Sequence, residues 1–215
     1  MKRIIIVISA LLIYSCSIIN VNNIAPGYTE AFVALKNATL GYEEKSLDPN
    51  VIYNIPYASS YIKIGKGPKA LMILESKNVS DFTWVTADGV YLVTRFGRII
   101  QTKGLYNNLS SSVHQTNSFD YKNSEKRTIY YSYDNPPLAN LKLESIYSIR
   151  GKQIIELFDR DKELTLVEEV ITNNYLGWKA INKYWIDENN FVWKSEQYIS
   201  PKLPKIVIEV TKKPS

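Results

Sequence analysis

Few side chains in this 215-residue chain could carry chemistry, and they fall into three groups. The first is the sole cysteine, Cys16. The second is an arginine pair, Arg95 and Arg98, which flanks a turn and could bind a carboxylate or phosphate in a bidentate manner. The third is aromatic, because tryptophan rings offer flat faces on which sugar rings can stack. These four tryptophans are Trp84, Trp178, Trp185 and Trp193. The arginines and tryptophans together are the candidate residues for binding a glycan or a protein partner.

A structural role explains the same residues equally simply. Tryptophans on strands usually pack in a core, and an arginine pair at a hairpin usually contacts solvent or a carboxylate of the protein itself. Both interpretations stay open at the level of the sequence.

No motif for catalysis is present. The chain has no Gly-x-Ser-x-Gly, no His-Glu-x-x-His and no phosphate-binding loop. Glu168 and Glu169 are adjacent on an expected strand, so they point to opposite faces and cannot form a carboxylate pair. His114 is the only histidine and is predicted to lie in an exposed loop. The sequence therefore predicts a protein that is not an enzyme and has no metal site and no cofactor.

The first sixteen residues resemble a bacterial lipoprotein signal. Lys2 and Arg3 precede an apolar run of about ten residues, which is too short to span a bilayer. The run ends in Ile13-Tyr14-Ser15-Cys16, which resembles the site that signal peptidase II cleaves. We therefore predict that residues 1–15 are removed and that Cys16 is acylated. An ordinary signal peptide with an incidental cysteine is the alternative.

Acylation of Cys16 would anchor the chain to a membrane. The diacylglycerol and N-acyl groups expected there bury enough methylenes for stable attachment. Residues 16–25 would then form a tether, followed by one periplasmic β domain over 26–215 or two similar halves divided near 106–126. Ser17 follows the cysteine where an aspartate would retain the protein, which favours the periplasmic face of the outer membrane.

The charge of the chain excludes nucleic acid as a partner. Removal of Lys2 and Arg3 leaves 24 basic against 21 acidic residues, a net charge of about +3. The basic residues are dispersed along the chain and do not form the clustered face that nucleic-acid binding needs.

Local patterns predict an all-β fold. Between Pro56 and Leu105, five short runs rich in Val, Ile, Tyr, Thr and Trp are separated by glycine-containing turns. Asp88-Gly89 is typical of a two-residue hairpin loop, so Phe82 to Thr86 should pair antiparallel with Val90 to Phe96. Arg98 to Lys103 should then return after a turn at Gly97.

The remainder of the chain repeats this pattern. We expect an amphipathic helix over Tyr28–Gly41 and a single helical turn opened by Asp48-Pro49. A polar loop is expected near 106–126, and seven further strands are expected between Arg127 and Thr211, with a turn at Gly151. About a dozen strands must close up or pack as two sheets, because long open edges invite aggregation. We therefore predict antiparallel sheets forming a curved barrel or sandwich, with a short N-terminal helix.

Three segments resemble a known family. "YASSYIKIGKGPKALMIL" is followed by "WVTADGVYLVTRFGRIIQTKGL", and "YWIDENNFVWKSEQYISPKLPKIVIEVTKK" lies near the C-terminus. These segments resemble the group 4 capsule polysaccharide lipoprotein family, and the similarity covers roughly residues 44 to 213.

The resemblance implies a function that the residues alone do not. It implies an outer-membrane lipoprotein that acts as a non-catalytic accessory in capsular or extracellular polysaccharide assembly or export. Its partners would be the membrane, through Cys16, together with polysaccharide export proteins and the polysaccharide itself. Two alternatives stay open. One is a lipid-binding or lipoprotein-sorting β module, and the other is a polysaccharide-modifying enzyme with carboxylates bracketing a sugar-sized gap.

Overall fold

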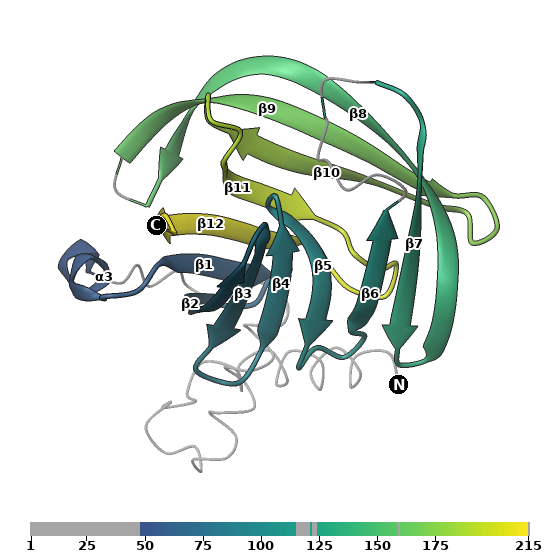
Figure 1. Ribbon diagram of the computed structural model, residues 1–215, viewed down its shortest axis with the longest axis horizontal. Helices are drawn as coiled ribbons and strands as arrows, with labels where there is room; N and C mark the ends of the chain where they lie inside the picture. Colours follow the sequence, from purple (N-terminus) through teal and green to yellow (C-terminus); the bar gives the residue numbers. More distant parts are fainter. Residues whose placement is uncertain (1–47, 115–120, 122–123, 159, 215) are drawn as a thin grey trace, which may run out of the picture. The chain divides into compact units, whose positions relative to one another are not determined.

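The structure is a computed structural model that describes residues 48–114, 121, 124–158 and 160–214, all within one compact unit spanning 42–215 (Figure 1). The expected signal peptide, tether and Tyr28–Gly41 helix lie outside the described residues. The short helix α3 (Pro49–Asn54) begins as predicted, because the Asp48 carboxylate accepts a hydrogen bond from the Asn50 backbone N–H at 2.9 Å.

Antiparallel strands make up most of the described chain. They are β1 (Ser59–Ile64), β2 (Lys69–Asn78), β3 (Asp81–Thr86), β4 (Tyr91–Arg95), β5 (Arg98–Lys103), β6 (Leu109–His114), β7 (Arg127–Asp134), β8 (Pro137–Leu157), β9 (Arg160–Asn173), β10 (Trp178–Ile186), β11 (Val192–Gln197) and β12 (Ile206–Lys212). They form one 12-stranded sheet in the order β5-β4-β3-β2-β1-β12-β11-β10-β9-β8-β7-β6. Consecutive strands are hydrogen-bonded neighbours except β5 and β6, which stand at the two ends of this order, and β1 also pairs with β12.

The sheet curls until its two end strands meet, which confirms the predicted all-β curved barrel. β5 and β6 lie side by side in Figure 1. The described strands β5 and β6 form no backbone ladder with each other, and side chains of β5 and of the β5–β6 connection hold them together instead. The Thr102 hydroxyl accepts from the Leu109 N–H at 2.9 Å, and the Asn108 side chain accepts from the Leu105 N–H at 2.8 Å. The barrel is therefore nearly closed, with one seam.

The hairpins predicted in the first half are confirmed. β3 pairs with β4 through partners such as Phe82↔Thr94, and β4 pairs with β5 across the turn at Gly97. Gly89 has φ +83°, which suits the tight Asp-Gly turn.

Two sequence predictions in the middle of the chain are wrong. Part of the expected loop at 106–126 is strand β6, whose exposed serines made it look like a loop. The expected turn at Gly151 is a β-bulge inside the continuous strand β8, where Ile149 pairs with Val167 and Gly151 with Leu166. Gly151 has φ +110°, and a positive φ serves a bulge as readily as a turn.

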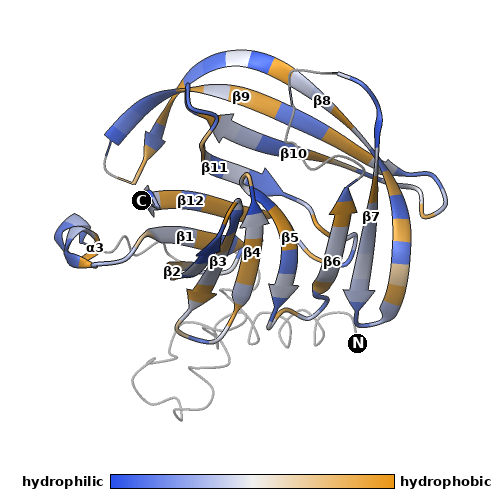
Figure 2. Ribbon diagram, in the orientation of Figure 1, coloured by the Kyte–Doolittle hydropathy of each residue, from blue (hydrophilic) through white to orange (hydrophobic). Residues whose placement is uncertain are grey.

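Alternation of hydrophobic and polar residues along the strands builds the core, as the colouring of β8 and β9 shows (Figure 2). The largest cluster draws on strands from both halves of the chain. Its buried members are Ile62, Met72, Trp84, Leu92, Ile99, Leu109, Ile129, Tyr131, Tyr133, Leu141, Leu143, Ile199, Ile206 and Ile208. Both halves of the sequence therefore contribute to this largest hydrophobic cluster.

The long β8–β9 hairpin curves back so that its tip contacts β12 and β1. The Phe158 backbone N–H donates to the Glu209 carboxylate at 2.6 Å. The Phe158 ring lies 5.6 Å from the Tyr61 ring, centroid to centroid. These contacts attach the hairpin tip to β1 and β12, which are the first and last strands in the sequence.

Gly97 provides the first testable prediction. Gly97 has φ +77°, and a Cβ there would lie 2.4 Å from the Val192 Cβ, whereas Gly89 has φ +83° with nothing within 4 Å. Gly89→Ala should lower the free energy of unfolding by about 1 kcal/mol through backbone strain alone. Gly97→Ala should cost at least about 2 kcal/mol more, because β11 must also move. Urea denaturation of both variants measures this, and equal losses would contradict the close contact between the β4–β5 turn and β11.

Candidate functional site

A cavity of about 620 Å³ lies between β3 and β4 on one side and β11 and β12 on the other. Turns that end these strands line it as well, at Val79-Ser80, Phe96-Gly97 and Asn189-Asn190. Five aromatic side chains line it: Phe82, Trp84, Phe96, Phe191 and Trp193. We call this space the aromatic cavity. It brings together two of the four tryptophans selected from the sequence.

Both of these tryptophans use their N–H groups within the protein. The Trp84 Nε1–H donates to the Thr94 hydroxyl at 3.0 Å, and the Trp193 Nε1–H donates to the Asp187 carboxylate at 2.9 Å. Burial opposes ionisation of Asp187, but hydrogen bonds from Trp193 and from the Phe191 backbone lower the pKa of this carboxyl below its usual value. Because their polar atoms are occupied, the two indoles can contribute only ring carbons to the cavity.

Basic side chains lie close to two aromatic rings of the cavity lining, Trp193 and Phe191. The Lys162 Nζ lies 4.1 Å from the centre of the Trp193 ring, and the Arg160 guanidinium lies 6.0 Å from it. The Lys213 Nζ lies 4.5 Å from the Phe191 ring and 3.7 Å from the Asp187 carboxylate. Cations at such distances are attracted to the aromatic faces.

The other two tryptophans do not line the aromatic cavity. The Trp185 Nε1–H donates to Gln153 at 3.1 Å, and its ring packs in the hydrophobic cluster that contains Trp193, although Trp185 itself does not line the cavity. Trp178 begins β10, packs against the large core cluster and lines a shallow groove with Tyr198. The four tryptophans therefore do not form one continuous aromatic surface.

The two arginines lie in different environments. Arg95 binds the Asp81 carboxylate through two hydrogen bonds of 2.6 and 2.7 Å on the partly exposed side of β3 and β4. This bidentate pairing lowers the pKa of Asp81. Arg98 is buried, with 2% of its surface exposed, and forms an ion pair with Glu169 of β9. Each guanidinium thus binds a carboxylate of the chain itself, and the pair does not form a shared anion site.

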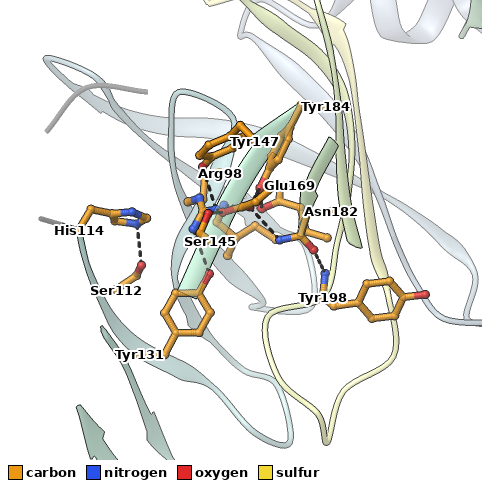
Figure 3. Close-up of polar contacts among 12 residues, drawn as sticks. Arg98, Ser112, His114, Tyr131, Ser145, Tyr147, Glu169, Asn182, Tyr184 and Tyr198 are labelled. Atoms are coloured by element: carbon orange, nitrogen blue, oxygen red, sulfur yellow. Dashed lines mark hydrogen bonds and ion pairs between the residues drawn. The ribbon is translucent and has the colours of Figure 1, made fainter. Parts of the chain in front are cut away.

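The Arg98–Glu169 pair is the centre of a buried polar network (Figure 3). The Glu169 carboxylate accepts hydrogen bonds from the side chains of Ser145, Asn182 and Tyr184. Arg98 donates to the hydroxyl of Tyr147 at 2.9 Å. Further contacts of the network involve Tyr131 and Gln197.

Glu169 was not a candidate in the sequence, although a signal was present. Val167, Glu169 and Ile171 alternate along β9, and all three are buried. A glutamate at an inward position of such a strand needs a buried cation. Glu168 lies on the other face and pairs with Arg150 at 2.7 Å, so the two glutamates point apart as predicted.

His114 is not the exposed loop residue that we expected. It ends β6 and is partly buried, and its Nε2 is hydrogen-bonded to the Ser112 hydroxyl at 2.9 Å (Figure 3). Burial and the positive charges of Arg98, Arg95 and Arg127 lower the pKa of His114 to about 3. Among the described residues, no group of three or more His, Cys, Asp or Glu side chains is arranged to hold a metal ion.

The ion pair gives a second prediction. Arg98→Met should lower the free energy of unfolding by about 3–5 kcal/mol, because Glu169 would be left charged and unpaired in the interior. Arg95→Met removes a partly exposed ion pair and should cost less than about 1 kcal/mol. Denaturant titration of the two variants measures the difference. The double variant Arg98→Met/Glu169→Met should recover part of the loss, and a loss as large as the sum of the single variants would contradict the pairing.

His114 gives a third prediction. Its low pKa means that the imidazole Hε1 resonance should show no titration midpoint between pH 5 and 8, and NMR can follow it without overlap because the chain has one histidine. Below pH 6.5 the unfolded chain binds a proton at this residue and the folded chain does not. The free energy of unfolding should therefore fall as the pH decreases from about 6.5 towards 3. His114→Gln should lose this part of the pH dependence, and a midpoint near 6.5 in the folded protein would contradict the burial.

Comparison with known proteins identifies a family model and relatives that match this chain in sequence. A family model described as "Group 4 capsule polysaccharide lipoprotein gfcB, YjbF" matches residues 32–211. The uncharacterized lipoprotein YjbF of Escherichia coli (strain K12) is 25% identical over 207 residues, which cover 93% of this chain and 92% of that protein. The uncharacterized lipoprotein GfcB of the same strain is 24% identical over 143 residues, or 63% of this chain and 66% of that protein.

A solved structure confirms the fold. The crystal structure of the hypothetical lipoprotein YmcC from Escherichia coli (K12) superposes with a TM-score of 0.70 and 20% identity, covering 80% of this chain and 91% of that one. In the described part of the chain, no helix combines the length and hydrophobicity required to cross a membrane. Because the family model covers most of the sequence, including the strands that form the aromatic cavity and the Arg98–Glu169 network, this chain belongs to the group 4 capsule polysaccharide lipoprotein family.

Proposed function

We propose that the protein is an acylated lipoprotein that assists the assembly or export of a capsular or other extracellular polysaccharide. The observation that carries this proposal is the family match over residues 32–211, together with relatives described as lipoproteins. The protein would lie at the periplasmic face of the outer membrane, attached through Cys16, and would act together with the export proteins.

The anchor determines how the barrel could work. Acyl groups on Cys16 hold the chain at the membrane surface stably. Residues 17–25 would then tether the domain, which keeps it within reach of other proteins of the same membrane. A tethered accessory needs only to bind, so a catalytic centre is not required.

The character of the site supports a binding role over catalysis. The described residues that line the aromatic cavity include no carboxylate. Hydrolysis of a glycosidic bond ordinarily uses two carboxyl groups that flank it. The buried Glu169 is occupied by Arg98, Asn182 and Tyr184, so it is not free to act as an acid or base.

A deletion strain tests the proposed function. Loss of the gene should lower the yield of surface polysaccharide, and the native sequence should restore it. Cys16→Ala should fail to restore the yield because the domain is no longer held at the membrane, whereas Ser17→Ala, next to the acylation site, should restore it. Labelled palmitate should be incorporated into the native protein and not into Cys16→Ala. An unchanged yield on deletion, under conditions in which the polymer is made, would overturn the role in export.

A further inference from the structure

The volume and the lining residues of the aromatic cavity suit the binding of an apolar group. Its volume of about 620 Å³ lies within the range of small-molecule sites in proteins. More than half of its lining residues are apolar. Trp84, Ile208 and Val210 have 2%, 6% and 6% of their surface exposed, so this part of the wall is shielded from water.

Polar side chains in the wall are largely occupied within the protein. The Thr94 hydroxyl accepts a hydrogen bond from Trp84, and the Ser195 hydroxyl accepts one from Gln197. The Asn190 side-chain oxygen accepts one from Tyr121. A sugar ring buried here would leave several hydroxyls without partners, which costs free energy. An aliphatic chain needs no such partners, so the wall favours an acyl chain over a saccharide.

The charges near the cavity favour a negatively charged head group. Lys213 lines the cavity, and the described lining residues include no acid; Lys194 also lines it, but its ammonium lies 5.7 Å from the centre of the Trp185 ring, outside the lining. Arg160 and Lys162 add positive charge beside Trp193. Asp187, 3.7 Å from Lys213, offsets part of this charge. The surroundings of Trp193 are therefore net positive and complement an anion.

We propose that the aromatic cavity binds one acyl chain of an anionic lipid. The chain lies against Trp84, Ile208 and Val210, and the head group lies near Lys213. This site is separate from the lipid expected on Cys16, and the proposal does not depend on the role in polysaccharide export. A free fatty acid and an anionic phospholipid both have the required chemistry.

Fluorescence titration tests the site directly. The full chain carrying Cys16→Ala is purified without detergent, which would compete for the cavity, and is titrated with cis-parinaric acid. Energy transfer from tryptophan to the polyene should saturate near one probe per chain. A saturable signal at this ratio would support the proposal, and its absence in a folded chain would overturn it.

Two substitutions that block the cavity locate the probe. Asn189→Trp places a bulky ring at an exposed turn that lines the cavity and should weaken binding at least about tenfold. Asn174→Trp makes the same change at the exposed β9–β10 turn, outside the lining, and should leave binding unchanged. Val210→Trp fills the inner wall and should abolish binding, and circular dichroism establishes that each variant is folded. Equal affinity of folded Asn189→Trp and Asn174→Trp would overturn the assignment to this cavity.

A charge variant tests the head group. Lys213→Gln should weaken binding of parinaric acid about threefold, as expected for a partly exposed ion pair. It should leave binding of the uncharged parinaryl alcohol unchanged. Lys142→Gln, on an exposed position of β8, is the matched control and should affect neither probe. Equal weakening of both probes by Lys213→Gln would overturn the anionic head group.

Competition identifies the source of the lipid. Displacement of the probe by phosphatidylglycerol vesicles, with no displacement by phosphatidylcholine vesicles, would support the proposal with a phospholipid as the ligand. Displacement by palmitic acid alone would support it with a free fatty acid. Displacement by an oligomer of glucuronic acid would overturn it in favour of an acidic saccharide. Failure here would leave the polysaccharide yield of the deletion strain unaffected, so the two proposals fail separately.

Discussion

The buried ion pair between Arg98 and Glu169 is the constraint that connects the rest of this barrel. Arg98 begins β5, near one end of the sheet, and Glu169 lies on β9, which is separated from β5 by many strands in the sheet order. A pair between such distant strands can form only when the sheet has curled. Once the sheet has closed, neither charge is tolerable alone in the interior, so β5 and β9 must each supply their half of the pair. The surrounding tyrosines, Ser145 and Asn182 form further hydrogen bonds to the pair, while the buried Arg98 Nε has no hydrogen-bond partner among the described residues.

The seam and the aromatic cavity both follow from this closure. Gln197 accepts from the Ile99 N–H at 2.9 Å and donates to the Gly97 carbonyl at 2.8 Å, so the turn before β5 is held against β11. Gly97 allows this approach because it has no side chain to meet Val192. The same approach brings Phe96 and Trp84 opposite Trp193. The cavity is therefore a consequence of how β4 and β5 meet β11 across the interior.

The proposed functions use different parts of the molecule. Anchoring depends on Cys16, which precedes the barrel in the sequence, whereas lipid binding depends on aromatic walls that exist only in the folded domain. Membrane attachment and an internal acyl-chain site are compatible, because a tether keeps the cavity close to a supply of lipid. Membership of a capsule-associated lipoprotein family suggests the process in which the protein acts. The cavity suggests a class of ligand, and its binding can be tested on the purified chain.

The sequence by itself determined the local structure, since hairpins depend on residues close together in the chain. Asp88-Gly89 and Asp48-Pro49 predicted a turn and a helix start correctly, and the alternating strands predicted an all-β barrel or sandwich. Short-range patterns could not separate a bulge from a turn at Gly151, nor recognise β6, whose side chains are mostly polar. Tertiary structure alone decided the environments of Arg95 and Arg98, which look alike in sequence, and selected Trp84 and Trp193 from four tryptophans. These outcomes depend on which distant strands meet when the sheet closes. Patterns of neighbouring residues contain no information about those contacts.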